Sequence, residues 1–269
     1  MAIQEGIIPL SGKMGDVIFS NRKGKKYAKA KSTKPMKQTV ATKKSSSDFG
    51  EASKVGARIR TAFAPLIKQY GDTAVVSCFT KYILKVFKTI PSTFIGSKKF
   101  GQGDVGIFKD FQFNASARLD SLLHQQPEIK LDGTGLHIAF KGNSIADLFK
   151  RVAKADAAVL QLMVYNLSLD GDEDEVVCIK DLFIPLESEH FRGAKLQVPL
   201  NFIGEQVVWV AMGVHFLNRM GMIGDRTKRA ASVVYVARLR DGLEVVFVPD
   251  QPALRHVEKD KEGIEWELE

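Results

Sequence analysis

A basic segment near the N-terminus divides this 269-residue chain into two unequal parts. Between Arg22 and Lys44 there are ten basic residues and no acidic one. The stretch from Ser32 to Ser47 also has few large apolar side chains, and Pro35 interrupts any regular element. Such a stretch cannot offset its loss of conformational entropy by burial. We therefore expect an extended arm outside the hydrophobic core.

Charge is distributed unevenly along the chain. Residues 1–60 hold 14 Lys and Arg against 4 Asp and Glu, whereas the remaining residues hold 25 against 27. The formal net charge of +8 therefore belongs to the N-terminal part. This asymmetry is typical of a segment that meets an anionic partner, such as nucleic acid, a membrane surface or an acidic protein patch.

The residues before the arm predict a β-hairpin over Met14–Lys31. Val17 and Phe19 alternate with their neighbours, a turn follows at Asn21–Gly24, and Tyr27–Lys31 supplies a return strand. Two strands alone bury too little apolar surface to be stable in water. The hairpin therefore needs support from the rest of the chain or from another subunit.

Two amphipathic helices are expected after the arm. Asp48, with Glu51 three residues later, has the pattern of a helix N-terminus, and Pro65 should kink or end the first helix. A second helix should run from Asp72 to Pro91, with Val75, Val76, Phe79, Tyr82, Ile83, Val86, Phe87 and Ile90 on one side. The apolar stripe of the first helix comprises Phe49, Ala52, Gly56, Ile59, Phe63, Leu66 and Tyr70.

The remainder predicts short strands separated by turns, which favours an antiparallel sandwich. A short helix is expected over Asn143–Lys154, and Asp250–Glu269 is expected to be a polar tail. The expected strands are Phe111–Phe113, Leu136–Phe140, Ala157–Leu169, Val176–Leu186, Leu196–Leu200, Val207–Leu217 and Ser232–Leu239.

The N-terminal sequence has neither a positive n-region nor a long apolar h-region, so no signal peptide is expected. No run approaches the roughly 18 apolar residues that a transmembrane helix requires. Cys78 and Cys178 lie in apolar runs and are expected to be buried thiols. These observations predict a soluble protein that is cytoplasmic or associated with a larger particle.

Three local patterns could indicate chemistry. Gly101–Gly106 matches GxGxxG, but no buried strand is expected before it, and we interpret it as a flexible glycine loop. Asp170–Glu175 resembles the start of a calcium loop but lacks the required glycine and glutamate, so an acidic connection that could receive a cation or a neighbour's arm is the better interpretation. Glu187, Glu189 and His190 share a loop without a nucleophile.

Several positions resemble an uncharacterised family of Bacteroidota proteins. The N-terminal matches are Gly12, Gly15, Val17, Tyr27, Pro35, Lys37-Gln38-Thr39, Phe49 and Pro65-Leu66. Those in the second half are Asp156, Val164-Tyr165-Asn166, Val198-Pro199-Leu200, Gly204, Val207 and Ser232–Val236. The resemblance implies a basic arm, a helical pair and immunoglobulin-like strands. It implies no activity.

We thus expect an α+β chain with a basic hairpin and extended arm (1–47), a helical hairpin (48–91), an immunoglobulin-like antiparallel β-sandwich (92–249) and a polar tail (250–269). The leading hypothesis is a non-enzymatic structural protein that self-associates or docks into a larger assembly through its arm. We expect Val17, Phe19, Tyr27, Phe49, Ile59 and Phe63 to carry that assembly.

The alternative is non-specific nucleic-acid binding, in which lysines neutralise phosphates. The residues expected to do so are Arg22, Lys23, Lys25, Lys26, Lys29, Lys31, Lys34, Lys37, Lys43 and Lys44. No catalytic residue, cofactor site or metal site is predicted.

Overall fold

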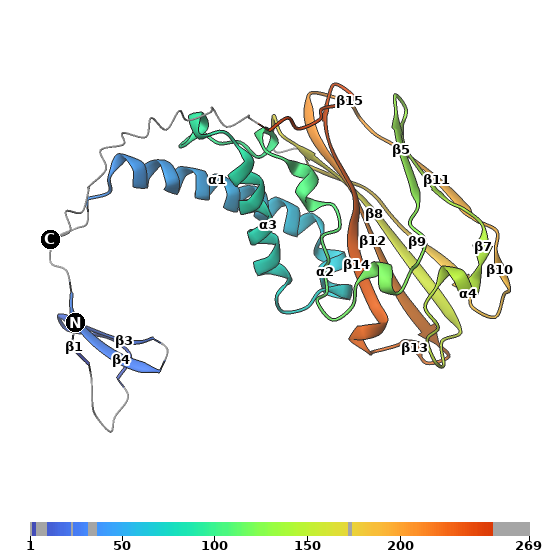
Figure 1. The fold of residues 1–269 in the computed structure, drawn as a ribbon, viewed down its shortest axis with the longest axis horizontal. Helices are drawn as coiled ribbons and strands as arrows, with labels where there is room; N and C mark the ends of the chain where they lie inside the picture. The colour runs from blue at the N-terminus through green and yellow to red at the C-terminus, as the bar shows by residue number, and fades with distance from the viewer. Residues whose placement is uncertain (1, 4–9, 23, 32–36, 172–173, 250–269) are drawn as a thin grey trace, which may run out of the picture. The chain divides into compact units, whose positions relative to one another are not determined.

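The computed structural model describes residues 2–3, 10–22, 24–31, 37–171 and 174–249 (Figure 1). The predicted tail, 250–269, lies outside these residues. The chain forms two compact units, Met1–Lys43 and Lys44–Glu269, which we call unit 1 and unit 2.

Unit 1 is a small antiparallel sheet. Its strands are β1 (Ala2–Ile3), β2 (Gly12–Met14), β3 (Val17–Arg22) and β4 (Lys25–Ala30), in the order β1-β4-β3-β2. The predicted hairpin is confirmed as β3 and β4. The sequence analysis missed the two flanking strands.

The helical region comprises α1 (Val40–Ala62), α2 (Ala64–Tyr70) and α3 (Val75–Thr89). The predicted start of the first helix was wrong, because α1 begins eight residues before Asp48. At that earlier start the hydroxyl of Thr39 accepts a hydrogen bond from the Thr42 amide at 3.2 Å, as an N-cap side chain does. Residues 40–47 are therefore helical, not extended.

The break at Pro65 is confirmed. Phe63 interrupts the helix between α1 and α2, and Pro65 lies in the first turn of α2, where its missing amide hydrogen costs no helical bond. In α3 the predicted inner face is largely correct, since Phe79, Ile83 and Val86 are buried, but Val76 is 51% exposed.

Unit 2 contains a large antiparallel sheet in the order β15-β14-β12-β8-β9, with β13 paired to β12. Its strands are β8 (Ala157–Ser168), β9 (Glu175–Pro185), β12 (Glu205–Asn218), β13 (Gly221–Met222), β14 (Arg229–Arg240) and β15 (Leu243–Glu244). The four long ones confirm predicted strands.

A smaller sheet has the order β11-β6-β5, and a short pair joins β7 to β10. These strands are β5 (Glu128–Asp132), β6 (Gly135–Phe140), β7 (Asn143–Ser144), β10 (His190–Phe191) and β11 (Ala194–Pro199). Prediction of β6 and β11 is confirmed, whereas β5 was missed. Phe111–Phe113 is not a strand of either sheet and forms a single bridge between Gln112 and Ser232.

The helix predicted over Asn143–Lys154 is reduced to α4 (Ile145–Leu148). Ser144 caps its start by accepting a hydrogen bond from the Asp147 amide. Phe149 then adopts an extended backbone and bridges to Leu123, which ends the helix after one turn.

Unit 2 has three layers, with helices on one face of the large sheet and the small sheet on the other (Figure 1). Short 3₁₀ turns lie at Ser92–Phe94, Phe100–Gln102, Val105–Phe108, Leu119–Ser121 and Arg226–Lys228. The second and third contribute Phe100, Val105 and Phe108 to the core between the helices and the large sheet. Phe63 lies 5.7 Å from Tyr165 and 6.0 Å from Trp209 between ring centroids, which joins the helical layer to the sheet. The α+β class and the sandwich are confirmed, but the helical cover on the outer face was not predicted.

Candidate interaction surface

The four-stranded sheet of unit 1 has one apolar face. In a strand successive side chains point to opposite faces, and directly paired residues of neighbouring strands share a face. Val17 pairs with Ala30, Phe19 with Ala28, and Met14 with Val17. These five residues therefore lie together, and we call them the apolar face.

The opposite side of the same sheet is basic. Ile18 pairs with both Lys13 and Lys29, and Tyr27 lies on the same face as Lys29 because they are two residues apart in β4. Lys25, two residues before Tyr27, extends the row. We call Lys13, Lys25, Lys29, Ile18 and Tyr27 the basic face.

Neither face is buried within the chain as described. Between Leu10 and Glu51, every residue whose burial is described is exposed or half-buried. Among the described residues, the first buried one is Ala52. Met14 is 61% exposed and Val17 37%. A small sheet with two uncovered faces gains little from the hydrophobic effect. Each face is thus open to a partner.

The residues predicted for assembly fall into three places. Val17 and Phe19 lie on the apolar face, whereas Tyr27 lies on the basic face. Phe49 is 56% exposed on α1. Ile59 and Phe63 are fully buried in the core of unit 2, so their assignment to an assembly surface was wrong. The stripe that they continue faces the large sheet of the same chain.

The residues predicted to contact nucleic acid are only partly gathered. Lys25 and Lys29 lie on the basic face, whereas Lys26 pairs with Asn21 on the opposite side. The side chains of Arg22, Lys23 and Lys34 lie outside the described residues. The remaining exposed members are Lys31 after β4, Lys37 before α1, and Lys43 and Lys44 on α1.

Sequence reasoning missed Met14, Ala28 and Ala30 on the apolar face, and Lys13 on the basic face. The missed strand β2 has only three residues, too few for an alternating pattern to be recognised. The available signal was Gly15, whose φ of 55° permits the tight turn between β2 and β3.

The acidic loop is held by the protein itself at both ends. Asp174 accepts a hydrogen bond from Nε of Arg58 at 2.8 Å, and Asp170 accepts one from the Glu205 amide at 2.6 Å. Asp172 and Glu173 lie outside the described residues. Binding of a cation or an arm would therefore compete with existing partners of Asp170 and Asp174.

Gly101–Gly106 is a packed turn, so its interpretation as a flexible loop was wrong. Gly101 and Gly103 are buried, and a Cβ on either would lie 2.5 Å from an atom of Leu169 or Val86. Asp104 accepts a hydrogen bond from the Gly106 amide at 2.9 Å. These glycines permit close packing of the chain against α3 and against Leu169, which follows β8.

The histidines and acids give no catalytic arrangement in the part of the chain that the structure describes. Glu187, Glu189 and His190 are exposed. His215 is buried, with Nδ1 lying 2.9 Å from the hydroxyl of Tyr70. Among described residues, no group of three or more His, Cys, Asp or Glu could hold a metal ion. Cys78 and Cys178 are free and half-buried.

Comparison with known proteins adds no identification. No protein-family model matches the chain, and a search of curated proteins gave no significant match. The resemblance to the Bacteroidota family stays a prediction. Within the described ranges, none of the helices is long and apolar enough to cross a membrane.

Proposed function

We propose that this protein is a non-enzymatic structural subunit that self-associates through the apolar face of unit 1. Two observations together carry the proposal. Five apolar residues share one face of the sheet, namely Met14, Val17, Phe19, Ala28 and Ala30. In addition, none of the residues described before Ala52 is buried. Apolar side chains that share one uncovered face favour contact with another apolar surface.

The occupant that fits this face is the same face of a second copy. Two sheets pack face to face at about 10 Å with interdigitated side chains, and an isologous contact of this kind closes on itself. Strands of six residues spaced about 4.8 Å apart give a face of roughly 300–400 Å². This lies below the roughly 800 Å² per partner of a typical stable interface. Association should therefore depend on concentration.

The test compares the full chain with a chain that begins at Val40. This truncation keeps all of α1 and removes none of the described side chains that are buried in unit 2. Light scattering after size exclusion should give a mass above one chain for the full protein at high concentration, and one chain for the truncated form. Equal subunit numbers in both forms would refute assembly through unit 1.

The basic face supports a second candidate, non-specific binding of nucleic acid. Lys13, Lys25 and Lys29 form a row that could contact phosphates, and Tyr27 beside them could stack on a base. The two candidates use opposite faces of one sheet, so substitutions can separate them. In either case we propose a cytoplasmic or particle-associated location.

A further inference from the structure

The net charge of this protein lies entirely in its N-terminal unit. Residues 1–43 hold 10 Lys and Arg against 2 Asp and Glu, whereas residues 44–269 hold 29 of each. On the unit 1 sheet, Lys13, Lys25 and Lys29 share the basic face. All three are exposed, and none of their side chains has an ion pair or hydrogen bond within the described part of the chain. These cations can therefore take an anionic partner.

The three lysines are spread over an area that suits a polyanion rather than one small anion. Lys25 and Lys29 lie four residues apart along β4, which corresponds to about 14 Å. Lys13 and Lys29 pair with Ile18 from its two sides, so they are two strand spacings, or about 10 Å, apart. Both separations are close to the width of the DNA major groove, about 12 Å. Phosphates on the two sides of a groove can thus contact different lysines at once.

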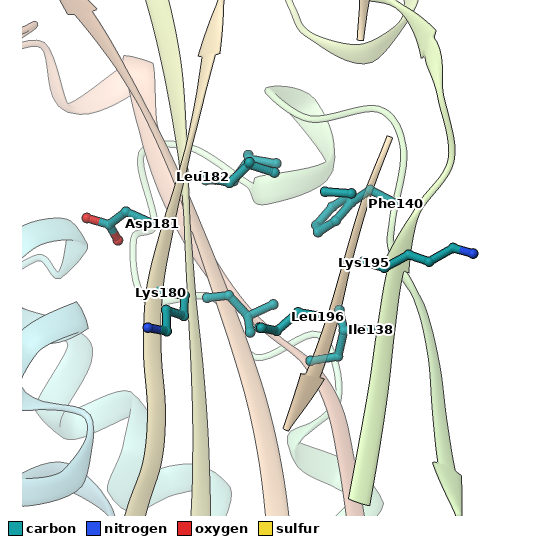
Figure 2. A pocket seen from close by; sticks show the side chains of 10 residues that line it. Ile138, Phe140, Lys180, Asp181, Leu182, Lys195 and Leu196 are labelled. Carbon is teal, nitrogen blue, oxygen red and sulfur yellow. The ribbon is translucent and has the colours of Figure 1, made fainter. Parts of the chain in front are cut away.

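The cations of unit 2 are offset by an equal number of acids. Ion pairs neutralise several of these cations, namely Arg118–Asp120, Lys141–Glu128, Arg238–Glu205 and Arg240–Glu205. Beside the apolar cleft between β9 and β11, Lys180 and Lys195 point in opposite directions and do not converge on one ligand (Figure 2). Unit 1 therefore carries the excess charge that attracts nucleic acid.

Association through the apolar face leaves both basic faces on the outside of the dimer. In a face-to-face pair the two sheets lie about 10 Å apart, and the twofold axis of an isologous contact turns their outer faces in opposite directions. A duplex of about 20 base pairs is stiff, because the persistence length of DNA is about 150 base pairs. Such a duplex can lie on one basic face but cannot bend round the sheet to reach the other.

We propose that the dimer bridges two nucleic-acid duplexes, with one duplex on each outward basic face. This inference rests on the self-association proposed for unit 1. A single chain contacts one duplex, whereas the dimer cross-links two. Bridging therefore requires the apolar face for pairing of the chains and the basic face for contact with phosphates.

A capture assay with the full chain at low salt tests bridging. One DNA duplex of about 20 base pairs is fixed to beads, and a free duplex of unrelated sequence carries a fluorophore. The natural chain, at concentrations where sedimentation velocity shows dimers, should retain the fluorescent duplex on the beads. Phe19→Ser should bind a single duplex with nearly natural affinity, measured by fluorescence anisotropy, but should capture the second duplex at least about tenfold less well.

The basic face is tested by changing Lys13, Lys25 and Lys29 together to Gln. This variant should self-associate like the natural chain but lose binding of the first duplex and capture of the second. The matched control changes Lys130, Lys150 and Lys154 in unit 2 to Gln, and it should retain capture. Circular dichroism establishes that each variant folds. Equal loss of capture in the two triple variants would overturn the role of the basic face.

Sedimentation velocity without DNA separates failure of bridging from failure of self-association. A natural chain that dimerises but captures no second duplex would overturn bridging alone. Undiminished capture by Phe19→Ser would also overturn it, because pairing through the apolar face would then be unnecessary. A natural chain that stays monomeric at every concentration would refute the self-association, and bridging by a dimer with it.

Discussion

Arg58 on α1 binds Asp174 at the start of β9. Nε of Arg58 donates to one carboxylate oxygen at 2.8 Å, and Nη2 donates to the other oxygen and to the carbonyls of Ser168 and Gly171. About three-quarters of each side chain is shielded from solvent, with 26% and 20% exposed. The pair therefore ties the helical layer to the turn between β8 and β9.

Asp174→Ala should lower the free energy of unfolding by about 1–3 kcal/mol, because the shielded guanidinium of Arg58 loses its two charge-assisted hydrogen bonds to this carboxylate. Urea denaturation measures this change. Arg118 and Asp120 supply the matched control, because their ion pair is 60% and 56% exposed. Asp120→Ala should leave the midpoint nearly unchanged. Equal losses of unfolding free energy in Asp174→Ala and Asp120→Ala would show that shielding from solvent does not strengthen the Arg58–Asp174 ion pair.

His215 should make stability depend on pH. Nδ1 of His215 lies 2.9 Å from the hydroxyl of Tyr70 and 3.1 Å from the side-chain amide nitrogen of Gln69. Both neighbours can donate a hydrogen bond to Nδ1, so protonation of this nitrogen would bring a third hydrogen-bond donor into contact with these two. Burial lowers the pKa of His215 below 6.5, an effect opposed by Asp181 and assisted by Arg229. As pH falls below about 6.5, the unfolded chain therefore binds a proton before the folded chain does.

The contribution of His215 to stability should thus be complete above about pH 6.5 and decline as the pH falls, by up to about 1.4 kcal/mol per pH unit. Urea midpoints between about pH 7.5 and 5.5 measure the decline. His215→Phe should flatten this dependence, whereas the control His124→Gln, at an exposed position, should retain it. A slope that is unchanged in His215→Phe would assign the dependence to other groups.

Two glycines should respond in opposite ways to alanine. A Cβ on Gly213 would lie 2.5 Å from the ring of Tyr70. A Cβ on Gly50 in α1 would meet no described atom within 4 Å beyond its chain neighbours and the backbone of its own helix. Gly213→Ala should cost about 1–3 kcal/mol through overpacking. Gly50→Ala should stabilise by up to about 1 kcal/mol through helix propensity. Thermal melts measure both changes, and a neutral Gly213→Ala would contradict the packing described for α2 on β12.

The long central strands could be predicted because their apolar residues are continuous. Val207–Phe216 and Ala157–Tyr165 are buried on both faces, and both runs lie within segments recognised as strands. What covers each face was not predictable, because the residue pattern of a buried strand is the same whether a helix or a second sheet packs on it. The contact of Phe63 with Trp209 joins distant segments and leaves no local pattern.

The interaction surface was predicted less well than the core. Val17 and Phe19 were identified by their alternation, but Ile59 and Phe63 were assigned to the same surface because an apolar stripe does not reveal which partner covers it. The start of α1 was missed because residues 40–47 have no buried side. The Thr39 cap, and not a buried face, stabilises this end of the helix.

The basic face leads to a prediction about salt. If nucleic acid binds there, the affinity of the full chain for single-stranded DNA should fall steeply as salt rises. Changing Lys13, Lys25 and Lys29 to Gln should weaken binding and make its salt dependence shallower. Lys130, Lys150 and Lys154 in unit 2 provide a control of equal charge change. If both triple variants lose the same affinity, binding is a property of net charge and not of this face.

Sedimentation velocity of Phe19→Ser and Tyr27→Ser tests the central claim most directly. These aromatic residues lie on neighbouring strands, are both half-buried, and occupy opposite faces of the unit 1 sheet. Phe19→Ser should weaken self-association by about tenfold or more, as loss of an aromatic anchor does, and Tyr27→Ser should leave it nearly unchanged. Circular dichroism establishes that both variants fold. Equal association of the two variants, at the strength of the natural chain, would contradict assembly through the apolar face.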